Sequence, residues 1–125
     1  MNVVDSSSWL EYFIDGENAD FFAPVIENPQ HILVPTISLF EVFKRVLLER
    51  NREDALQAVA QMTEGRVVDL DESLALFAAE LSCELKLPLA DSIILATARA
   101  NNATLWTQDR HFKSMDEVKY IEKKA

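Results

Sequence analysis

Several residue types are scarce in this 125-residue chain, and each scarcity narrows the class of protein that it can be. A single cysteine, Cys83, excludes an internal disulfide framework. It falls in a helical pattern beside Leu76 and Ala79, which predicts a buried, reduced thiol without a functional role. With two glycines and four prolines, no stretch has the composition of a linker, a repeat or a low-complexity tract. We therefore expect one domain over residues 1–125.

Long apolar runs are also missing. No segment approaches the length of a membrane span, and no charged-then-apolar leader is present. We expect a soluble, cytoplasmic protein without a membrane partner. Because 49% of the residues are hydrophobic, the chain can still build a single sizeable core.

Basic residues are few: 12 Lys and Arg stand against 21 Asp and Glu, for a net charge of −9. This balance argues against nucleic acid as a partner, because phosphate binding is driven by Lys and Arg. Exposed charges are screened beyond about 8 Å at physiological salt, however, so a local basic rim could still hold a phosphate. The excess of carboxylates either keeps the protein soluble or converges on a cation, and composition does not choose between these.

Short strands alternate with helices along the chain. Strands are predicted at 1–5, 31–36, 66–70, 103–107 and 118–122, and helices at 6–13, 19–26, 37–50, 53–63, 71–86 and 87–100. Alternation of this kind predicts parallel pairing with helices on both faces of the sheet. The expected fold class is α/β, with three layers (α/β/α) and a central parallel sheet of four to five strands.

The helices at 37–50 and 71–86 carry apolar residues at helical spacing. Thr36 or Ser38 can cap the first of them. Its predicted apolar face carries Phe40, Phe43 and Leu47. The predicted apolar face of the second carries Leu74, Phe77, Leu81 and Leu85.

Four acids are predicted to share one edge of the sheet, because ligands of open parallel sheets bind outside the carboxyl ends of the strands. Asp5 ends the first strand, and Asp109 follows the fourth. Glu41 lies in the second turn of the helix after the second strand. Asp91 lies in the first turn of the helix 87–100, where the helix dipole favours an anion.

Each of these acids also has a simpler interpretation. Asp5 could bond the amides of the next helix, and Asp91 could be only a favourable first-turn acid. Glu41 could pair with Arg45 at the i,i+4 spacing, and Asp109 could be a turn residue. The convergence of the four acids, with apolar neighbours around Glu41 and Asp91, favours a shared site.

Carboxylates packed close together repel, so either some of them are protonated or a cation lies among them. Without a Cys or His cluster, the ligands would be hard oxygens, which favours Mg²⁺ or Mn²⁺ over Zn²⁺. His31 precedes a strand and is predicted to be structural. His111 follows Asp109 closely and is either near the site or, as is more common, an isolated surface histidine.

Four segments occur in the order and at the spacing of a known family: VVDSSSW, ISLFEVFK with its Glu41, LADSIILATARA and LWTQDRHF. On these motifs the chain resembles the PIN-domain ribonucleases, and most closely the small stand-alone toxins of the VapC type. The resemblance implies a PIN-like parallel sheet with an acidic pocket that holds one or two Mg²⁺ or Mn²⁺ ions. It implies hydrolysis of RNA phosphodiesters with 5′-phosphate and 3′-hydroxyl products.

The resemblance also implies roles for particular residues and partners. The catalytic, metal-binding acids would be Asp5, Glu41, Asp91 and Asp109, supported by the hydroxyls of Ser6, Ser7 and Thr107. A cognate antitoxin and a homodimer are implied in addition to the RNA substrate. Lys44 and Arg45 lie three and four residues after Glu41, so either could touch a phosphate, as could Arg110 beside the fourth motif.

Two other classes remain open at this stage. A receiver-like phosphoacceptor domain is also an acidic α/β unit with Mg²⁺, and Asp69 could be its acceptor. Such a domain requires a lysine directly after the corresponding strand, however, and no lysine directly follows the strand 103–107. A non-catalytic PIN-like interaction module, whose acids bind a basic partner, is the second alternative.

Overall fold

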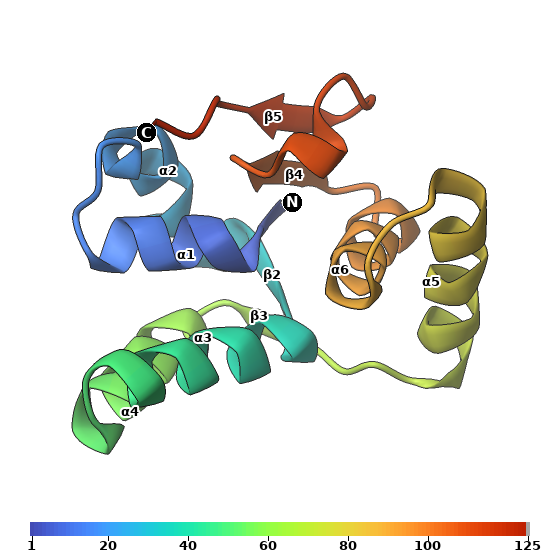
Figure 1. Ribbon diagram of the computed structural model, residues 1–125. Helices are drawn as coiled ribbons and strands as arrows, with labels where there is room; N and C mark the ends of the chain where they lie inside the picture. The colour runs from blue at the N-terminus through green and yellow to red at the C-terminus, as the bar shows by residue number, and fades with distance from the viewer. Residues whose placement is uncertain (125) are drawn as a thin grey trace.

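Residues 1–124, which the computed structural model describes, fold around a five-stranded sheet with helices on both faces (Figure 1). The strands are β1 (Asn2–Val4), β2 (Ile32–Pro35), β3 (Arg66–Val68), β4 (Thr104–Thr107) and β5 (Val118–Tyr120). The helices are α1 (Ser6–Phe13), α2 (Ala19–Ile26), α3 (Thr36–Glu49), α4 (Arg52–Met62), α5 (Glu72–Leu85) and α6 (Leu89–Ala100), with 3-10 turns η1 (Pro29–His31) and η2 (Arg110–Phe112). All strand pairs are parallel, which confirms the predicted three-layer α/β class.

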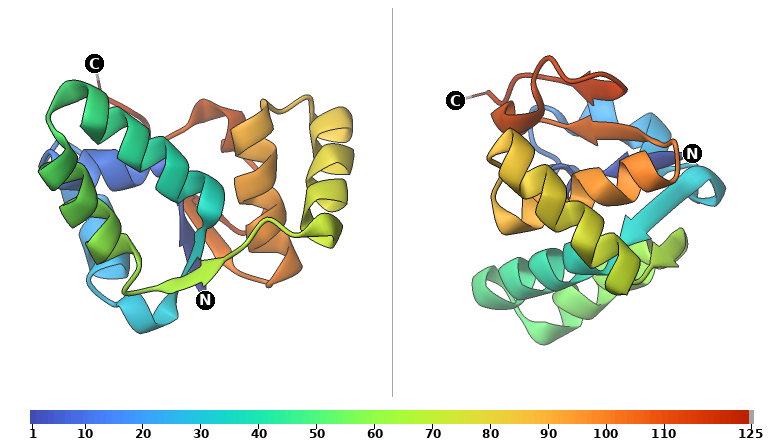
Figure 2. Two further views of the ribbon diagram at one scale, coloured as in Figure 1. Left: turned by 90° about the horizontal axis from the view of Figure 1, so that it is seen from below. Right: turned by 90° about the vertical axis from the view of Figure 1, so that its right-hand side faces the viewer.

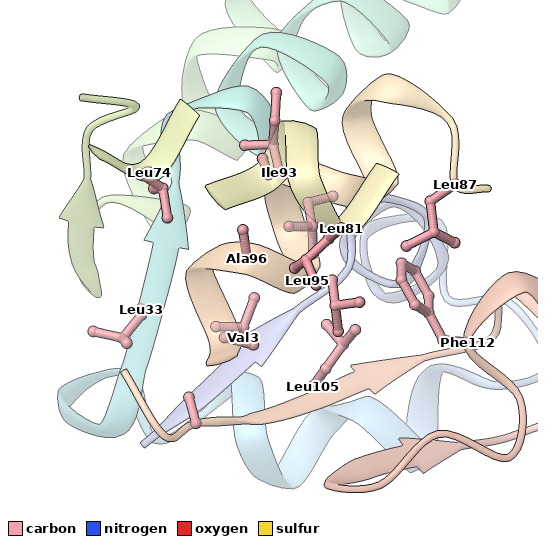
Figure 3. Close-up of a cluster of buried hydrophobic side chains, with 14 residues drawn as sticks. Val3, Leu33, Leu74, Leu81, Leu87, Ile93, Leu95, Ala96, Leu105 and Phe112 are labelled. Atoms are coloured by element: carbon pink, nitrogen blue, oxygen red, sulfur yellow. The ribbon is translucent and has the colours of Figure 1, made fainter. Parts of the chain in front are cut away.

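The two faces of the sheet carry separate hydrophobic clusters. Successive side chains of a strand point to opposite faces, so Val3 packs toward α5 and α6 while Val4 packs toward α1 to α4. Figure 3 shows the first cluster, in which Leu105 of β4 lies beneath Leu95 of α6 and Leu33 of β2 lies at the side of the cluster. Figure 2 shows α4 on one side of the sheet and α5 on the other, while α3 comes into contact with α6. The central strands are therefore buried on both sides.

The strand order places β1 at the centre of the sheet. The order is β3-β2-β1-β4-β5, so the chain builds outward through β2 and β3 and then returns to the other side of β1. The order thus reverses between β1 and β4, at the type of position where open α/β sheets bind ligands. Val4 pairs with Trp106, and the Asp5 amide donates to the Trp106 carbonyl at 3.0 Å. The two strands therefore end level with each other.

Helix α6 is buried over most of its length. Every residue from Ser92 to Ala98 is buried, because the helix lies against the sheet on one side and α5 on the other. Its sequence is accordingly apolar almost all round. Despite this apolarity, no helix within residues 1–124 is long and apolar enough to cross a membrane.

The predicted start and apolar face of α3 are wrong in detail. Pro35 occupies the N-cap position and no side chain caps the helix, so neither Thr36 nor Ser38 has the predicted role. The helix starts immediately after β2, which places Thr36 already inside its first turn. The buried stripe runs through Ser38, Val42 and Val46, while Phe40 and Leu47 are exposed. Apolar residues occur on two faces of α3, and packing against the sheet selects only one.

Helix α5 buries a narrower stripe than predicted. Leu74 and Leu81 are buried as expected, but Leu85 is exposed. Cys83 is also exposed, so the prediction of a buried thiol is wrong. Cys83 lies two residues after Leu81 and therefore falls on the opposite side of the helix. Leu76 is exposed as well. Because α5 is an outer helix that packs on α6, it has only one side to bury.

Candidate active site

A pocket with a cavity volume of about 390 Å³ lies at the carboxyl ends of β1 and β4. It is bounded by α1, by α3, by the first turn of α6 and by the segment after β4. Its lining comprises Asp5, Ser6, Ser7, Leu10, Phe40, Glu41, Lys44, Arg45, Leu48, Asp91 and Asp109. All four acids predicted to converge therefore do so.

Asp5 is the buried centre of this pocket, with only 3% of its surface exposed. Although it occupies the N-cap position of α1, its side chain does not bond the helix amides. Its Oδ2 instead accepts hydrogen bonds from Thr107 Oγ1 at 2.9 Å and from Ser7 Oγ at 3.2 Å. The simpler interpretation of Asp5 as a helix-capping residue is thus wrong.

Burial raises the pKa of Asp5 to about 7. The Thr107 hydrogen bond lowers this pKa in part, while the negative charges of Asp91 and Asp109 raise it further. A carboxylate with a pKa in this range is held ionised at neutral pH only at a cost in free energy, which an added positive charge would remove.

The Thr107 hydroxyl links two of the acids. While it donates to Asp5, its oxygen accepts the backbone N–H of Asp109 at 2.9 Å. Asp109 Oδ1 in turn accepts the backbone N–H of His111 at 2.9 Å, so Asp109 also fulfils the turn role considered for it. Thr107 is fully buried. One hydroxyl therefore fixes the position of Asp109 relative to Asp5.

Replacing Thr107 by valine should test this link. The methyl group keeps the shape but removes the hydroxyl, so the pKa of Asp5 should rise above its present value. If the acids act as proposed below, RNA cleavage should fall by about 10- to 100-fold and its pH profile should shift to higher pH. Thr107→Ser, which keeps the hydroxyl, is the matched control. Equal pH profiles for Thr107→Val and wild type would contradict the assignment.

His111 contacts two of the acids, Asp91 and Asp109. Its Nδ1 lies 2.7 Å from Asp91 Oδ2 and 2.9 Å from Asp109 Oδ1. The ring is 53% exposed, yet it contacts both carboxylates, so the more common alternative of an isolated surface histidine is wrong. Burial raises the pKa of Asp91 to about 6, the charge of Asp109 adds to this rise, and His111 opposes it. The position of His111 two residues after Asp109 was the only sequence signal for this contact.

Glu41 reaches the pocket from α3 and is half-buried. The predicted alternative, an ion pair with Arg45, is not formed, because Arg45 Nε lies 2.7 Å from Glu49 Oε1. Within residues 1–124, neither Glu41 nor Asp5 has an ion-pair partner. Two of the four acids thus line the pocket without an ion pair to a basic side chain among residues 1–124.

The donor set fits a divalent cation. Oxygens of Asp91 and Asp109 and a ring nitrogen of His111 all lie within 4.8 Å of one another. The hydroxyl of Ser6, buried in the pocket lining, has no hydrogen-bond partner within residues 1–124. Several hard oxygens with one imidazole nitrogen suit Mg²⁺ and, because of the nitrogen, Mn²⁺ in particular. An imidazole nitrogen therefore lies beside the oxygen donors that the sequence predicted.

The predicted phosphate-binding cations are placed unequally. Lys44 and Arg45 both line the pocket. Arg110 is exposed on η2 and does not line it. The basic rim of this acidic pocket is therefore formed by α3.

A buried polar pair that the sequence did not indicate supports the end of β4. Asn18 Nδ2 donates to Gln108 Oε1 at 2.9 Å and to the backbone oxygen of Glu122 at 3.0 Å. Gln108 lies between Thr107 and Asp109, so this pair ties the site to the segment before α2. The partners are 90 residues apart, and no local pattern could have revealed them.

The receiver-like alternative does not fit this arrangement. Asp69, its candidate acceptor, follows β3 at the edge of the sheet and lines a different cavity, between β3 and α5. A phosphoacceptor in such a domain would have to lie among the other acids. The acids that do converge come from β1, α3, α6 and the end of β4.

The fold and the pocket together define a class: three-layer parallel α/β proteins with an acidic pocket at the carboxyl end of the central strand. Within that class, the chain belongs to the PIN domain family, whose sequence profile matches residues 3–118. The family resemblance that the four acidic motifs indicated is thereby confirmed.

Solved structures share this fold over nearly the whole chain. A structure described as a toxin-antitoxin complex from Klebsiella pneumoniae matches with a TM-score of 0.78 and 22% identity, covering 94% of this chain and 95% of that one. VapC20 of Mycobacterium tuberculosis, described as a sarcin-ricin loop cleaving toxin, matches with a TM-score of 0.77 and 19% identity over 95% and 98%. DNA-bound VapBC of Salmonella typhimurium matches with a TM-score of 0.73 and 16% identity, covering 97% of this chain and 96% of that one. The comparison with curated proteins gave no match.

Proposed function

We propose that the protein is a metal-dependent endoribonuclease that hydrolyses RNA phosphodiesters and leaves 5′-phosphate and 3′-hydroxyl ends. The observation that carries the proposal is the convergence of Asp5, Glu41, Asp91 and Asp109 in one pocket at the carboxyl ends of β1 and β4. Membership of the PIN domain family supports it.

In this proposal the four acids and His111 hold Mg²⁺ or Mn²⁺. When bound, such an ion lowers the pKa of water and stabilises negative charge on phosphoryl oxygens. Thr107 and Ser7 orient the Asp5 carboxylate by donating to its Oδ2. Lys44 and Arg45 bind phosphates of the substrate at the rim of the pocket. In this proposal the four clustered acids contribute to the reaction only when they hold a cation.

We propose further that the protein is the cytoplasmic toxin of a toxin-antitoxin pair and acts as a homodimer. The support is the fold shared with toxins solved in such complexes, over nearly the full length of each chain. Expression of the chain alone should arrest growth, and expression with its cognate antitoxin should restore it. Growth unaffected by an active, soluble chain would contradict the toxin role and leave the nuclease activity standing.

The nuclease activity is tested with purified protein and single-stranded RNA. Cleavage should require Mn²⁺ or Mg²⁺, stop on addition of EDTA, and leave ends that a 5′-phosphate-dependent exonuclease can digest. Asp91→Asn should abolish it while the far-ultraviolet circular dichroism stays unchanged. Retention of RNA binding without any cleavage in either metal would overturn the enzyme proposal and favour a non-catalytic interaction module.

A further inference from the structure

One side of α3 presents an unusual strip of side chains to the pocket. Phe40, Lys44 and Leu48 lie at i, i+4 and i+8, and all three line the pocket. Phe40 is 59% exposed and Leu48 is 74% exposed. The acids do not account for an aromatic ring at this place, since a phenyl side chain offers neither a ligand atom to a divalent metal ion nor a hydrogen bond to a phosphate.

The ring already makes one polar contact, with a cation of the same helix. Lys44 Nζ lies 5.8 Å from the centroid of the Phe40 ring. This distance is within the range of a cation–π contact, which holds the ammonium group beside the ring. Because Phe40 nevertheless stays more than half exposed, a flat apolar surface and a positive charge are available side by side.

A flat aromatic face next to a cation matches the chemistry of an unpaired nucleotide. Single-stranded RNA is bound by stacking of its bases on aromatic side chains, with Lys or Arg on the neighbouring phosphates. Phe40 directly precedes Glu41 in the chain and shares the pocket with Asp5. A base stacked on Phe40 would therefore belong to a nucleotide close to the phosphate held at the acids.

We propose, on the basis of the proposed nuclease function, that Phe40 is a stacking site for an unpaired base of the RNA and that Lys44 binds the adjoining phosphate. Base-paired RNA does not offer a free base face to the ring.

The composition of the pocket favours RNA over a protein partner at this place. Six of the eleven lining residues are charged, and only Leu10, Phe40 and Leu48 are apolar. A docked apolar helix would have to cover the buried carboxylate of Asp5 and its neighbours without supplying a cation. A nucleotide places its phosphate toward Lys44 and its apolar base face toward Phe40.

The first test is RNA binding in EDTA, which prevents cleavage, with a fluorescent pool of short single-stranded RNAs of randomised sequence. Phe40→Ala should weaken binding by about 5- to 100-fold, the range for loss of one stacked base. Phe40→Trp should bind at least as well as wild type. Phe40→Leu, the matched control that is apolar but has no π face, should bind nearly as poorly as Phe40→Ala.

Two further readouts separate stacking from charge. Lys44→Gln should lower the slope of log Kd against log salt by about one, whereas Phe40→Ala should leave that slope unchanged. In an RNA that the wild-type protein cleaves, the bases can be removed one at a time. We expect the wild-type protein to bind more weakly when the base at one particular position near the cut is missing. Phe40→Ala should be insensitive to base removal at that position, because it has already lost the stack.

Several results would overturn the assignment. Equal binding by Phe40→Leu and wild type would show that apolarity alone matters. Unchanged RNA binding by Phe40→Ala, with a changed mass in sedimentation, would place Phe40 in a protein interface instead. If the wild-type protein cleaves RNA and every Phe40 variant binds RNA normally, the stacking site alone is refuted. If the wild-type protein neither binds nor cleaves RNA, the nuclease function itself is refuted. Because Phe40 is exposed, unchanged thermal unfolding should verify that each variant folds.

Discussion

Asp5→Asn should abolish RNA cleavage and at the same time stabilise the metal-free protein at pH 8. The asparagine Oδ1 can still accept the hydrogen bonds of Thr107 and Ser7, so the local geometry is kept. The buried negative charge is lost, and with it the interaction with a cation. Cleavage should fall by at least about 100-fold, as for loss of a group that stabilises charge in the transition state.

The gain in stability follows from the raised pKa of Asp5. This pKa is about 7 in the folded protein against 3.8 for an unperturbed aspartate, so folding favours the protonated acid. The stability that protonated Asp5 contributes is fully present below the pKa of the unfolded state, and it is lost as the pH rises through about 7. At pH 8 the ionised group costs up to about 4 kcal/mol, from about 1.4 kcal/mol per pKa unit. Asparagine avoids this cost.

Urea unfolding in EDTA at pH 4 and pH 8 measures the effect. The free energy of unfolding of Asp5→Asn should exceed that of wild type at pH 8, and the difference should shrink at pH 4. Asp69→Asn, which removes an exposed acid outside the pocket, is the control and should change neither stability nor cleavage. Cleavage by Asp5→Asn at the wild-type rate would refute the acidic-pocket mechanism.

Mn²⁺ should raise the melting temperature of the wild-type protein, and more so at pH 8 than at pH 5. At a concentration 100 times its Kd, a ligand that binds only the folded state stabilises it by about 2.7 kcal/mol. For a chain of this size that corresponds to a shift of about 10 °C. At the proposed site, protons would compete with the cation for Asp5 and Asp91, whose pKa values are raised to about 7 and about 6, so the shift should diminish at pH 5.

Thermal unfolding with Mn²⁺, Mg²⁺ or EDTA checks this expectation. His111→Gln should reduce the Mn²⁺ shift more than the Mg²⁺ shift, because it removes the imidazole nitrogen near Asp91 and Asp109. His31→Gln replaces the other histidine of the chain, which is exposed in η1, and should leave both shifts unchanged. An equal Mn²⁺ shift in wild type and Asp5→Asn would show that the ion binds elsewhere.

The helices and strands could be predicted from the sequence because their apolar periodicities differ and turn residues separate them. The strand order could not, since β1 pairs with β2 and β4 through crossovers that no local pattern encodes. The face of α3 was misassigned for a related reason. Both Phe40 and Val42 suit a helical stripe, and only the position of the sheet decides that Val42 is buried.

The acids of the site were predictable because they follow strand ends or start helices, which are positions that the sequence reveals. The contacts among them depend on tertiary structure. His111 meets Asp91 only because η2 lies against the first turn of α6, and Gln108 meets Asn18 across 90 residues. The hydroxyl of Thr107 was singled out by family resemblance, but its simultaneous bonds to Asp5 and Asp109 depend on how β1 and β4 pair in the folded chain.

The burial of α6 has a consequence for how the protein can lose its activity. Asp91 stands at the start of a helix in which every residue from Ser92 to Ala98 is buried between sheet and α5. We expect amide protons in such a segment to exchange with solvent with free energies close to that of global unfolding. We therefore expect fraying of an outer helix such as α4 to leave Asp91 in place, and the loss of Asp91 from the pocket on heating or in denaturant to coincide with global unfolding.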